Sequence, residues 1–160
     1  MSKMLDCLIV GQGIAGSCLG YCLEQLINKI RLKTNRVISI KLSPDQTDEH
    51  ILQIAELVSQ LNLMVINAGN TQFKTIREVN LSTKEISIGG GGLSGPYLFE
   101  RTLSMIKLLK PFKLPLIATG GISTANQVNL CLQNGASLIG MATGLAFNPF
   151  TICKILKKLS

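Results

Sequence analysis

Apolar residues along the chain fall into short continuous runs, and most of these runs are followed by a stretch with helical periodicity. The runs, which predict strands, are residues 5–10, 37–42, 63–67, 115–119 and 137–141. The periodic stretches, which predict helices, are residues 14–31, 48–61, 98–110, 124–134 and 149–159. In the second of these, the stripe at i, i+3, i+4 and i+7 spacing is Ile51, Ile54, Ala55, Val58 and Leu61. Strands that alternate with helices predict an α/β fold with a mainly parallel sheet.

Residues 68–96 interrupt this alternation, because they contain no helical pattern. Within them, the stretch 79–88 predicts either a small hairpin or an irregular excursion. A long insertion after a strand is either a loop that covers a ligand or a mobile surface loop. The run "GGGGLSG" at 89–95 also has two interpretations. It is a slack linker, or its backbone must approach a bulky anionic group that leaves no room for side chains.

Composition and charge narrow the classes of function. The chain has 160 residues, of which 46% are hydrophobic and 16% charged, a balance that excludes a disordered chain. The net charge is +7, with basic residues concentrated at 29–36 and 154–158. Aromatic residues make up only 4% and do not alternate with the basic ones, so we expect no nucleic-acid partner. The basic residues form either a site for small phosphorylated ligands or a solvated rim.

The cysteines and the apolar runs indicate a cellular compartment. The five cysteines include no C-x-x-C pair and no zinc-ligand spacing, so we expect no metal site and a reduced, cytoplasmic environment. No apolar run reaches the roughly 18 residues of a transmembrane helix. His50, the single histidine, is expected to be a solvated residue at the start of a helix.

A first glycine motif lies in "VGQGIAG", residues 10–16. Gly11, Gly13 and Gly16 match G-x-G-x-x-G between a strand and a helix, the context of a dinucleotide site. The stretch "DCLIVGQGIAGSCLGY" resembles the start of FAD-dependent oxidoreductases of the amino-acid-oxidase type. Such a site also needs a carboxylate after the next strand, where this chain has Lys41, whose ammonium cannot accept a ribose hydrogen bond. Residues 1–33 are therefore expected to be a βα unit that either binds FAD or only packs.

A second set of motifs is spread over the rest of the chain. In order they are "IKLSPDQTD" (40–48), "INAGNT" (66–71), "GGLSGP" (91–96), "IATGGIST" (117–124) and "GASLIGMATG" (135–144). Together they resemble the C-terminal half of dihydroorotate dehydrogenases, which are flavin (β/α)8 barrels that oxidise dihydroorotate to orotate in pyrimidine biosynthesis. The resemblance implies that residues 34–160 form strands five to eight of a partial TIM-type barrel, preceded by the extra βα unit. The site is then expected at the carboxyl ends of the strands.

The resemblance also implies a site for flavin mononucleotide (FMN). The implied cofactor contacts are Lys41 near N1 and O2 of the flavin ring, Gly95 close to the cofactor, and Gly120, Gly121, Ala142 and Thr143 around the phosphate, ahead of helix N-termini. A cation at the ring stabilises the anionic reduced flavin.

Two alignments are open for the substrate contact. The soluble subfamilies place their asparagine where this chain has Asn67, and the membrane-linked subfamily reads Asn-Thr where it has Asn70 and Thr71. The motifs "KLSP" and "GGLSGP" lean towards the soluble kind. The electron acceptor (quinone, NAD or fumarate) stays open, and a quinone-linked enzyme would associate peripherally with a membrane.

The resemblance leaves part of the enzyme without a counterpart. In this family the base that removes the C5 proton is a serine or cysteine of the first half-barrel, so no catalytic residue is identified here. We expect the isolated chain to have little or no dehydrogenase activity. The alternatives are a non-catalytic remnant or subunit, and an FAD-binding fragment.

A half-barrel also leaves open sheet edges and an exposed inner face. Three outcomes are expected to compete. Self-association or a partner completes the barrel, the N-terminal strand caps an edge, or the chain is a truncated, rearranged product that folds poorly.

Overall fold

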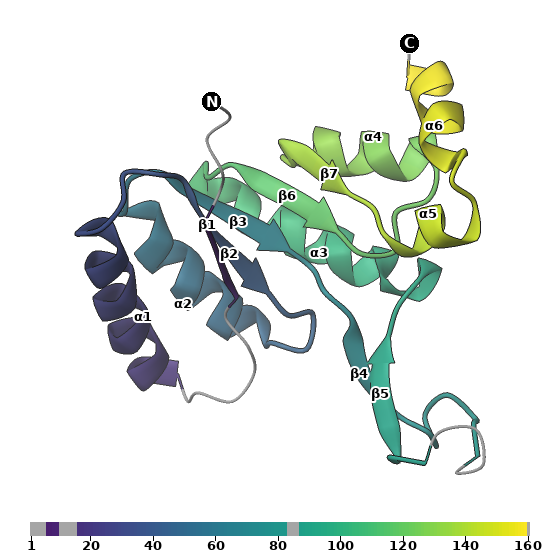
Figure 1. The fold of residues 1–160 in the computed structure, drawn as a ribbon, viewed down its shortest axis with the longest axis horizontal. Helices are drawn as coiled ribbons and strands as arrows, with labels where there is room; N and C mark the ends of the chain where they lie inside the picture. Colours follow the sequence, from purple (N-terminus) through teal and green to yellow (C-terminus); the bar gives the residue numbers. More distant parts are fainter. Residues whose placement is uncertain (1–5, 10–15, 83–86, 160) are drawn as a thin grey trace.

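A twisted parallel sheet with helices packed along it forms the body of the protein (Figure 1). The structure is a computed structural model that describes residues 6–9, 16–82 and 87–159. The strands of the sheet are β1 (Asp6–Ile9), β2 (Ile38–Leu42), β3 (Met64–Ala68), β6 (Leu116–Thr119) and β7 (Leu138–Gly140). They pair in the order β1-β2-β3-β6-β7, and every pairing is parallel. The expected α/β architecture is confirmed, with a strand at each of the apolar runs.

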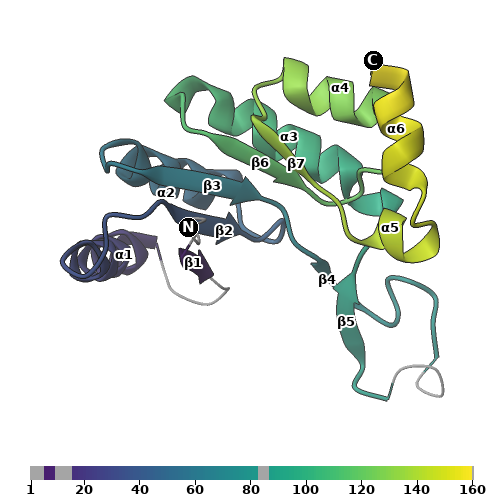
Figure 2. The same cartoon turned by 45° about the horizontal axis from the view of Figure 1, so that its top comes forward.

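The first four helices pack against one another in chain order, and the last packs against the two before it (Figure 2). They are α1 (Gly16–Arg31), α2 (Asp48–Ser59), α3 (Phe99–Leu109), α4 (Ala125–Gln133), α5 (Thr143–Phe147) and α6 (Thr151–Leu159), with short 3-10 turns η1 (Pro96–Leu98) and η2 (Lys110–Phe112). The start of α2 illustrates how the sequence sets a helix boundary. The side chain of Thr47 accepts a hydrogen bond from the backbone N–H of His50, and acidic residues occupy the first turn.

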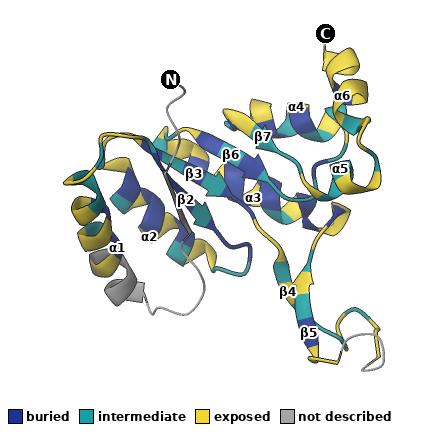
Figure 3. Ribbon diagram, in the orientation of Figure 1, coloured by how far each residue is buried: buried dark blue, intermediate teal, exposed yellow. Residues whose placement is uncertain are grey.

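The two faces of the sheet differ in burial (Figure 3). In β2, Ile38, Ile40 and Leu42 are at most 1% exposed and belong to the hydrophobic core. The alternate residue Lys41 is only partly buried. On β7, Leu138 is 61% exposed. The inner face is therefore partly open among the described residues, as expected for a half-barrel.

The N-terminal strand joins the same sheet. β1 pairs with β2 in a register that runs from Asp6 opposite Ile38 to Ile9 opposite Lys41. Of the arrangements expected for the open edge, the structure therefore has β1 covering the free side of β2. The residues of the first glycine motif between α1 and β1, 10–15, lie outside the described residues. The division of the chain at residues 33 and 34 stays a prediction.

Residues between β3 and α3 form a two-stranded antiparallel arm that projects from the sheet (Figure 1). Its strands are β4 (Gln72–Thr75) and β5 (Gly90–Leu93). These strands flank the stretch 79–88, whose described residues, 79–82 and 87–88, form no strand. Residues 83–86 lie outside the described part of the chain, so the choice between a small hairpin and an irregular excursion stays a prediction.

The glycine run owes part of its composition to this arm. A Cβ on Gly90 would lie 2.8 Å from the carbonyl oxygen of Lys74, and one on Gly92 would lie 2.5 Å from Thr71 Oγ1. These two glycines allow close pairing of the strands, which neither the linker nor the ligand interpretation anticipated.

Candidate functional site

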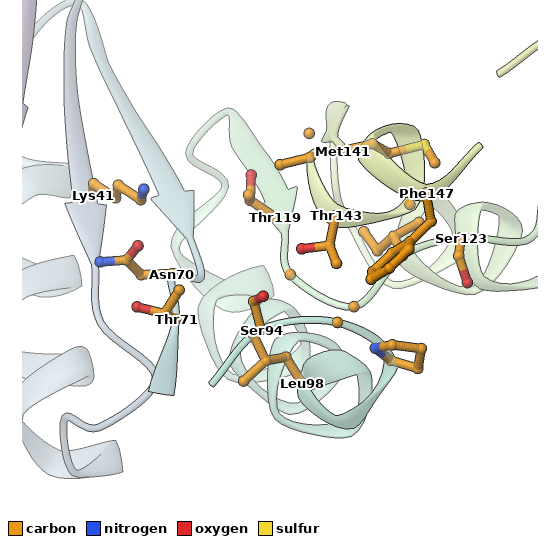
Figure 4. Close-up of a pocket in the computed structure, with 18 residues that line it drawn as sticks. Lys41, Asn70, Thr71, Ser94, Leu98, Thr119, Ser123, Met141, Thr143 and Phe147 are labelled. Atoms are coloured by element: carbon orange, nitrogen blue, oxygen red, sulfur yellow. The ribbon is translucent and has the colours of Figure 1, made fainter. Parts of the chain in front are cut away.

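A cavity of about 350 Å³ lies beyond the carboxyl ends of the strands and beside the root of the arm (Figure 4). Its volume falls in the range of roughly 300–1,000 Å³ that is usual for small-molecule sites. It is lined by Lys41, Asn70, Thr71, residues 94–96, Leu98, residues 119–123, residues 140–144 and Phe147. The lining comes from the ends of four strands of the sheet and from the segment after β5, so it exists only in the folded chain.

The cavity gathers most of the residues that the sequence singled out. Those that line it are Lys41, Gly95, Gly120, Gly121, Ala142, Thr143, Asn70 and Thr71. Asn67 is not among the lining residues. Ten further lining residues were not predicted from the sequence: Ser94, Pro96, Leu98, Thr119, Ile122, Ser123, Gly140, Met141, Gly144 and Phe147. All but Leu98 and Phe147 lie inside the quoted glycine-rich motifs, which is the signal that could have pointed to them.

Lys41 is the only charged side chain among the described residues that line the cavity. It lies near the end of β2, and its ammonium points towards the cavity in Figure 4. Among the ion pairs between described residues, none includes Lys41. A partly buried cation without a carboxylate partner favours an anionic or electron-rich ligand, because such a ligand would satisfy its charge.

Asn67 lies one strand away, opposite Lys41 in the pairing of β2 with β3. Its Oδ1 atom is buried and has no hydrogen-bond partner in the structure. An unsatisfied buried acceptor costs about 1–3 kcal/mol. The side chain therefore indicates a polar partner that the described residues do not supply.

The loop after β6 is shaped by two glycines with positive φ, 124° at Gly120 and 71° at Gly121. A Cβ on Gly120 would lie 2.7 Å from Thr102 Oγ1, and one on Gly121 would lie 2.4 Å from the backbone nitrogen of Phe99. The backbone N–H groups of Gly121 and Ile122 donate to no residue that the structure describes. Consecutive unpaired N–H groups in such a turn form a binding concavity for anions.

The N-termini of the two helices beside the cavity, α4 and α5, differ in whether side chains cap their backbone N–H groups. At α4, the Thr124 side chain accepts from the N–H of Gln127, and the Gln127 side chain accepts from the N–H of Thr124, which closes a capping box. At α5, Ala142 is the N-cap residue and no side chain caps the helix. The unsatisfied N–H donors expected at a helix start are therefore open at α5 and occupied at α4. The expectation placed a phosphate ahead of the helices that follow Gly121 and Ala142, and of these two helices only α5 has an uncapped start.

Within the run "GGGGLSG", only Ser94 and Gly95 line the cavity. Gly95 has a φ of 98°, and a Cβ placed there would meet only Thr143 Cγ2, at 3.8 Å. Its backbone conformation, rather than a lack of space, is what requires glycine. The glycine run thus serves the arm at one end and the cavity at the other.

The described part of the chain contains neither a cluster of metal ligands nor a helix suited to a membrane. No group of three or more His, Cys, Asp or Glu side chains there could hold a metal ion. No helix among these residues has the length and apolar character needed to cross a membrane.

Known proteins are similar to this chain in sequence. The family model for dihydroorotate dehydrogenase matches residues 20–160. A dihydroorotate dehydrogenase (quinone) of Rhodococcus opacus (strain B4) is 37% identical over 130 residues, which cover 77% of this chain and 36% of that protein. One of Mycolicibacterium vanbaalenii is 33% identical over 129 residues, which cover 78% of this chain and 36% of that protein.

A solved structure agrees in fold. The crystal structure of DHODH in complex with ferulenol from Eimeria tenella matches with a TM-score of 0.66 and 24% identity, over 77% of this chain and 33% of that one. The chain thus spans 36% of the length of the curated relatives that it matches. Because the family model covers most of its residues, the chain belongs to the dihydroorotate dehydrogenase family.

Proposed function

We propose that this chain forms the FMN site of a dihydroorotate dehydrogenase, an oxidoreductase that converts dihydroorotate to orotate in pyrimidine biosynthesis. The family is flavin-dependent. The observation that carries the proposal is the convergence of Lys41, Gly121 and Thr143, from three separate strand ends, on one cavity.

The lining residues fit an elongated, phosphorylated ligand. In Figure 4, Lys41, Asn70 and Thr71 lie on one side of the cavity, and Thr143 and Met141 lie on the other. The second side has the unpaired N–H groups of the loop after β6 and the uncapped start of α5. No described lining residue is a carboxylate, so nothing there would repel a phosphate. The phosphate of FMN would accept from these N–H groups, and its ring system would lie towards Lys41.

The chemistry divides between the cofactor and the chain. When bound, FMN would supply the acceptor for the hydride that leaves C6 of dihydroorotate. Lys41 would hold a fixed ammonium beside the ring, where a preorganised cation favours the negative charge that develops during the reaction. The carboxamide of Asn70 can both donate and accept, which suits the carboxylate and the cyclic amide of the substrate. Asn67, with its unsatisfied Oδ1, is the second candidate for a polar contact with the bound molecules.

The electron acceptor is the finer part of the proposal. The motifs lean towards the soluble subfamilies, whereas the relatives described above are named as quinone enzymes. The lining of the cavity by Asn70 and Thr71, the residues of the membrane-linked alignment, supports the quinone assignment. We therefore propose a quinone acceptor and a peripheral association with a membrane.

One observation favours a second candidate, flavin binding without turnover. Lys41 is the only charged side chain among the described lining residues, and its proposed role is to remain a cation rather than to remove a proton. A general base must lie within hydrogen-bond reach of the proton that it removes. We therefore expect little or no turnover of dihydroorotate by the purified 160-residue chain.

The open inner face supports a third part of the proposal, self-association or a partner that completes the barrel. Leu138 on β7 is 61% exposed, and β7 has no neighbour on its far side among the described strands. Cys131 and Cys153 are free thiols, which suits the reduced, cytoplasmic compartment that we propose.

Expression of the chain and identification of any bound flavin test the proposal. We expect a yellow protein that releases FMN on denaturation, and little flavin in the variant Lys41→Ala. Release of FAD would instead support a dinucleotide site at Gly11 and Gly13. A colourless chain that also fails to bind added FMN would refute the proposed site.

A further inference from the structure

A chain of hydrogen bonds joins helix α3, the loop after β2 and the projecting arm. The loop covers residues 43–47. Arg101, in the first turn of α3, donates from Nε to the carbonyl oxygen of Pro44 (3.1 Å) and from Nη2 to that of Gln46 (2.7 Å). Its Nη1 donates to Asp48 Oδ1 at 2.6 Å, which forms an ion pair. The planar guanidinium thus holds two carbonyl groups of the loop and the first residue of α2 at once.

Asp45 connects this loop to the arm. Its carboxylate oxygens Oδ1 and Oδ2 accept from the backbone N–H of Phe73 on β4, at 3.2 and 3.0 Å. The carboxylate is itself held by Ser43, whose hydroxyl donates to Oδ2 at 3.3 Å. No other hydrogen bond between described residues ties β4 or β5 to the loop after β2.

The root of the arm is also a wall of the cavity. Asn70 and Thr71, directly before β4, line the cavity, and so do Ser94 and Gly95, directly after β5. The two sides of the root are in close contact, because even a Cβ on Gly92 would come within 2.5 Å of Thr71 Oγ1. They are therefore expected to move together.

The covalent chain and these hydrogen bonds together form a closed circuit of connections between the arm, α3 and the loop after β2. From Gly95 the chain continues through η1 into α3, whose Arg101 holds the loop after β2. From that loop, Asp45 reaches back to the arm at Phe73. Lys41 lies two residues before the loop begins, so the circuit fixes the arm relative to the charged end of the cavity.

We propose that Asp45 and Arg101 are positioning residues that hold the root of the arm at the distance from Lys41 at which the cavity binds its ligand. Neither side chain lines the cavity, so neither contacts the ligand itself. The identity of the ligand, FMN, rests on the proposed function. The placement of the arm does not.

The first test measures affinity for FMN by the quenching of flavin fluorescence during titration of the purified chain. Asp45→Ala and Arg101→Gln are each expected to raise the Kd about tenfold, the scale of one lost charge-assisted hydrogen bond. Asp45→Asn retains an oxygen that accepts from the N–H of Phe73, so it should stay within about twofold of wild type. The matched controls are Glu56→Ala on α2 and Lys107→Gln on α3, both exposed, and they should leave the Kd unchanged.

The second test needs no ligand. Hydrogen exchange of the backbone amides in β4 and β5 should become faster in Asp45→Ala and return towards wild type in Asp45→Asn, while exchange in β3 stays the same. The inference is overturned if Asp45→Ala matches its Glu56→Ala control in both measurements, or if Asp45→Asn is as impaired as Asp45→Ala. If the wild-type chain does not bind FMN, the proposed function fails, and the exchange experiment alone decides the role of Asp45.

Discussion

Replacing Gly121 with alanine tests whether the backbone of the loop after β6 has the conformation on which the site depends. Its φ of 71° lies in the left-handed region, where an L residue costs about 1–2 kcal/mol. The new Cβ would lie 2.4 Å from the nitrogen of Phe99 and 3.0 Å from the carbonyl oxygen of Gly95, so backbone must shift. Overpacking of this kind costs about 1–3 kcal/mol. The free energy of unfolding should therefore fall by roughly 2–5 kcal/mol.

Thermal unfolding followed by circular dichroism measures this loss. For a chain of this size each kcal/mol lowers Tm by about 2–4 °C, so we expect a decrease of about 10 °C. The matched control is Gly91→Ala, because a Cβ there meets nothing within 4 Å and should change the free energy by less than about 0.5 kcal/mol. The shift should also move Gly95 and weaken FMN binding. Equal stability of Gly121→Ala and Gly91→Ala would refute the steric reasoning.

Three further predictions concern the ligand, a buried thiol and the open face. Lys41→Gln should lower FMN affinity by tenfold or more in a fluorescence titration, because it removes the only charged side chain among the described lining residues, and the difference from wild type should shrink with added salt. An unchanged Kd would contradict the proposed role. Burial raises the pKa of the Cys131 thiol to about 11, so at pH 8 it should react with a thiol reagent far more slowly than the exposed Cys153. The stability that this neutral thiol contributes to the folded state should be lost between about pH 9 and 11. Equal labelling of both cysteines in the folded chain would contradict this prediction. The purified chain should associate as its concentration rises, and Leu138→Asn should raise the dissociation constant of the oligomer about tenfold, because a leucine that is 61% exposed in the single chain no longer becomes buried on association. Sedimentation velocity measures the dissociation constants of wild type and variant. A wild-type monomer at every concentration would rule out self-association.

The regular elements of the body could be predicted because their signals are local. The apolar stripe of α2 and the apolar runs of β2 and β3 each follow from the spacing of a few neighbouring residues. The same residues, for example Ile51 and Ile54, form the hydrophobic core. The prediction of the last helix was less complete. It was expected over 149–159, whereas the structure has α5 over Thr143–Phe147 before α6, because a single short turn of helix has no periodic signal.

The arm could not be predicted from local pattern. β5 consists of three glycines and a leucine, a composition with low β propensity. It is a strand because β4 supplies hydrogen-bond partners and because glycine admits the close approach of Thr71. Likewise, the hydrogen bond from the backbone N–H of Phe73 to the Asp45 carboxylate joins residues 28 positions apart, and no sequence pattern in either segment predicts it.

The sequence by itself determined which residue types stand at the strand ends, namely a lysine, two asparagines and several glycines, because strand boundaries and turns are set by neighbouring residues. Only the tertiary structure decided that Lys41 and the glycine loop at 120–121 face one cavity, that Asn70 lines it while Asn67 stays in the sheet, and that the start of α5 rather than α4 is open. The physical reason is that these relations depend on strand register and on packing between segments far apart in the chain.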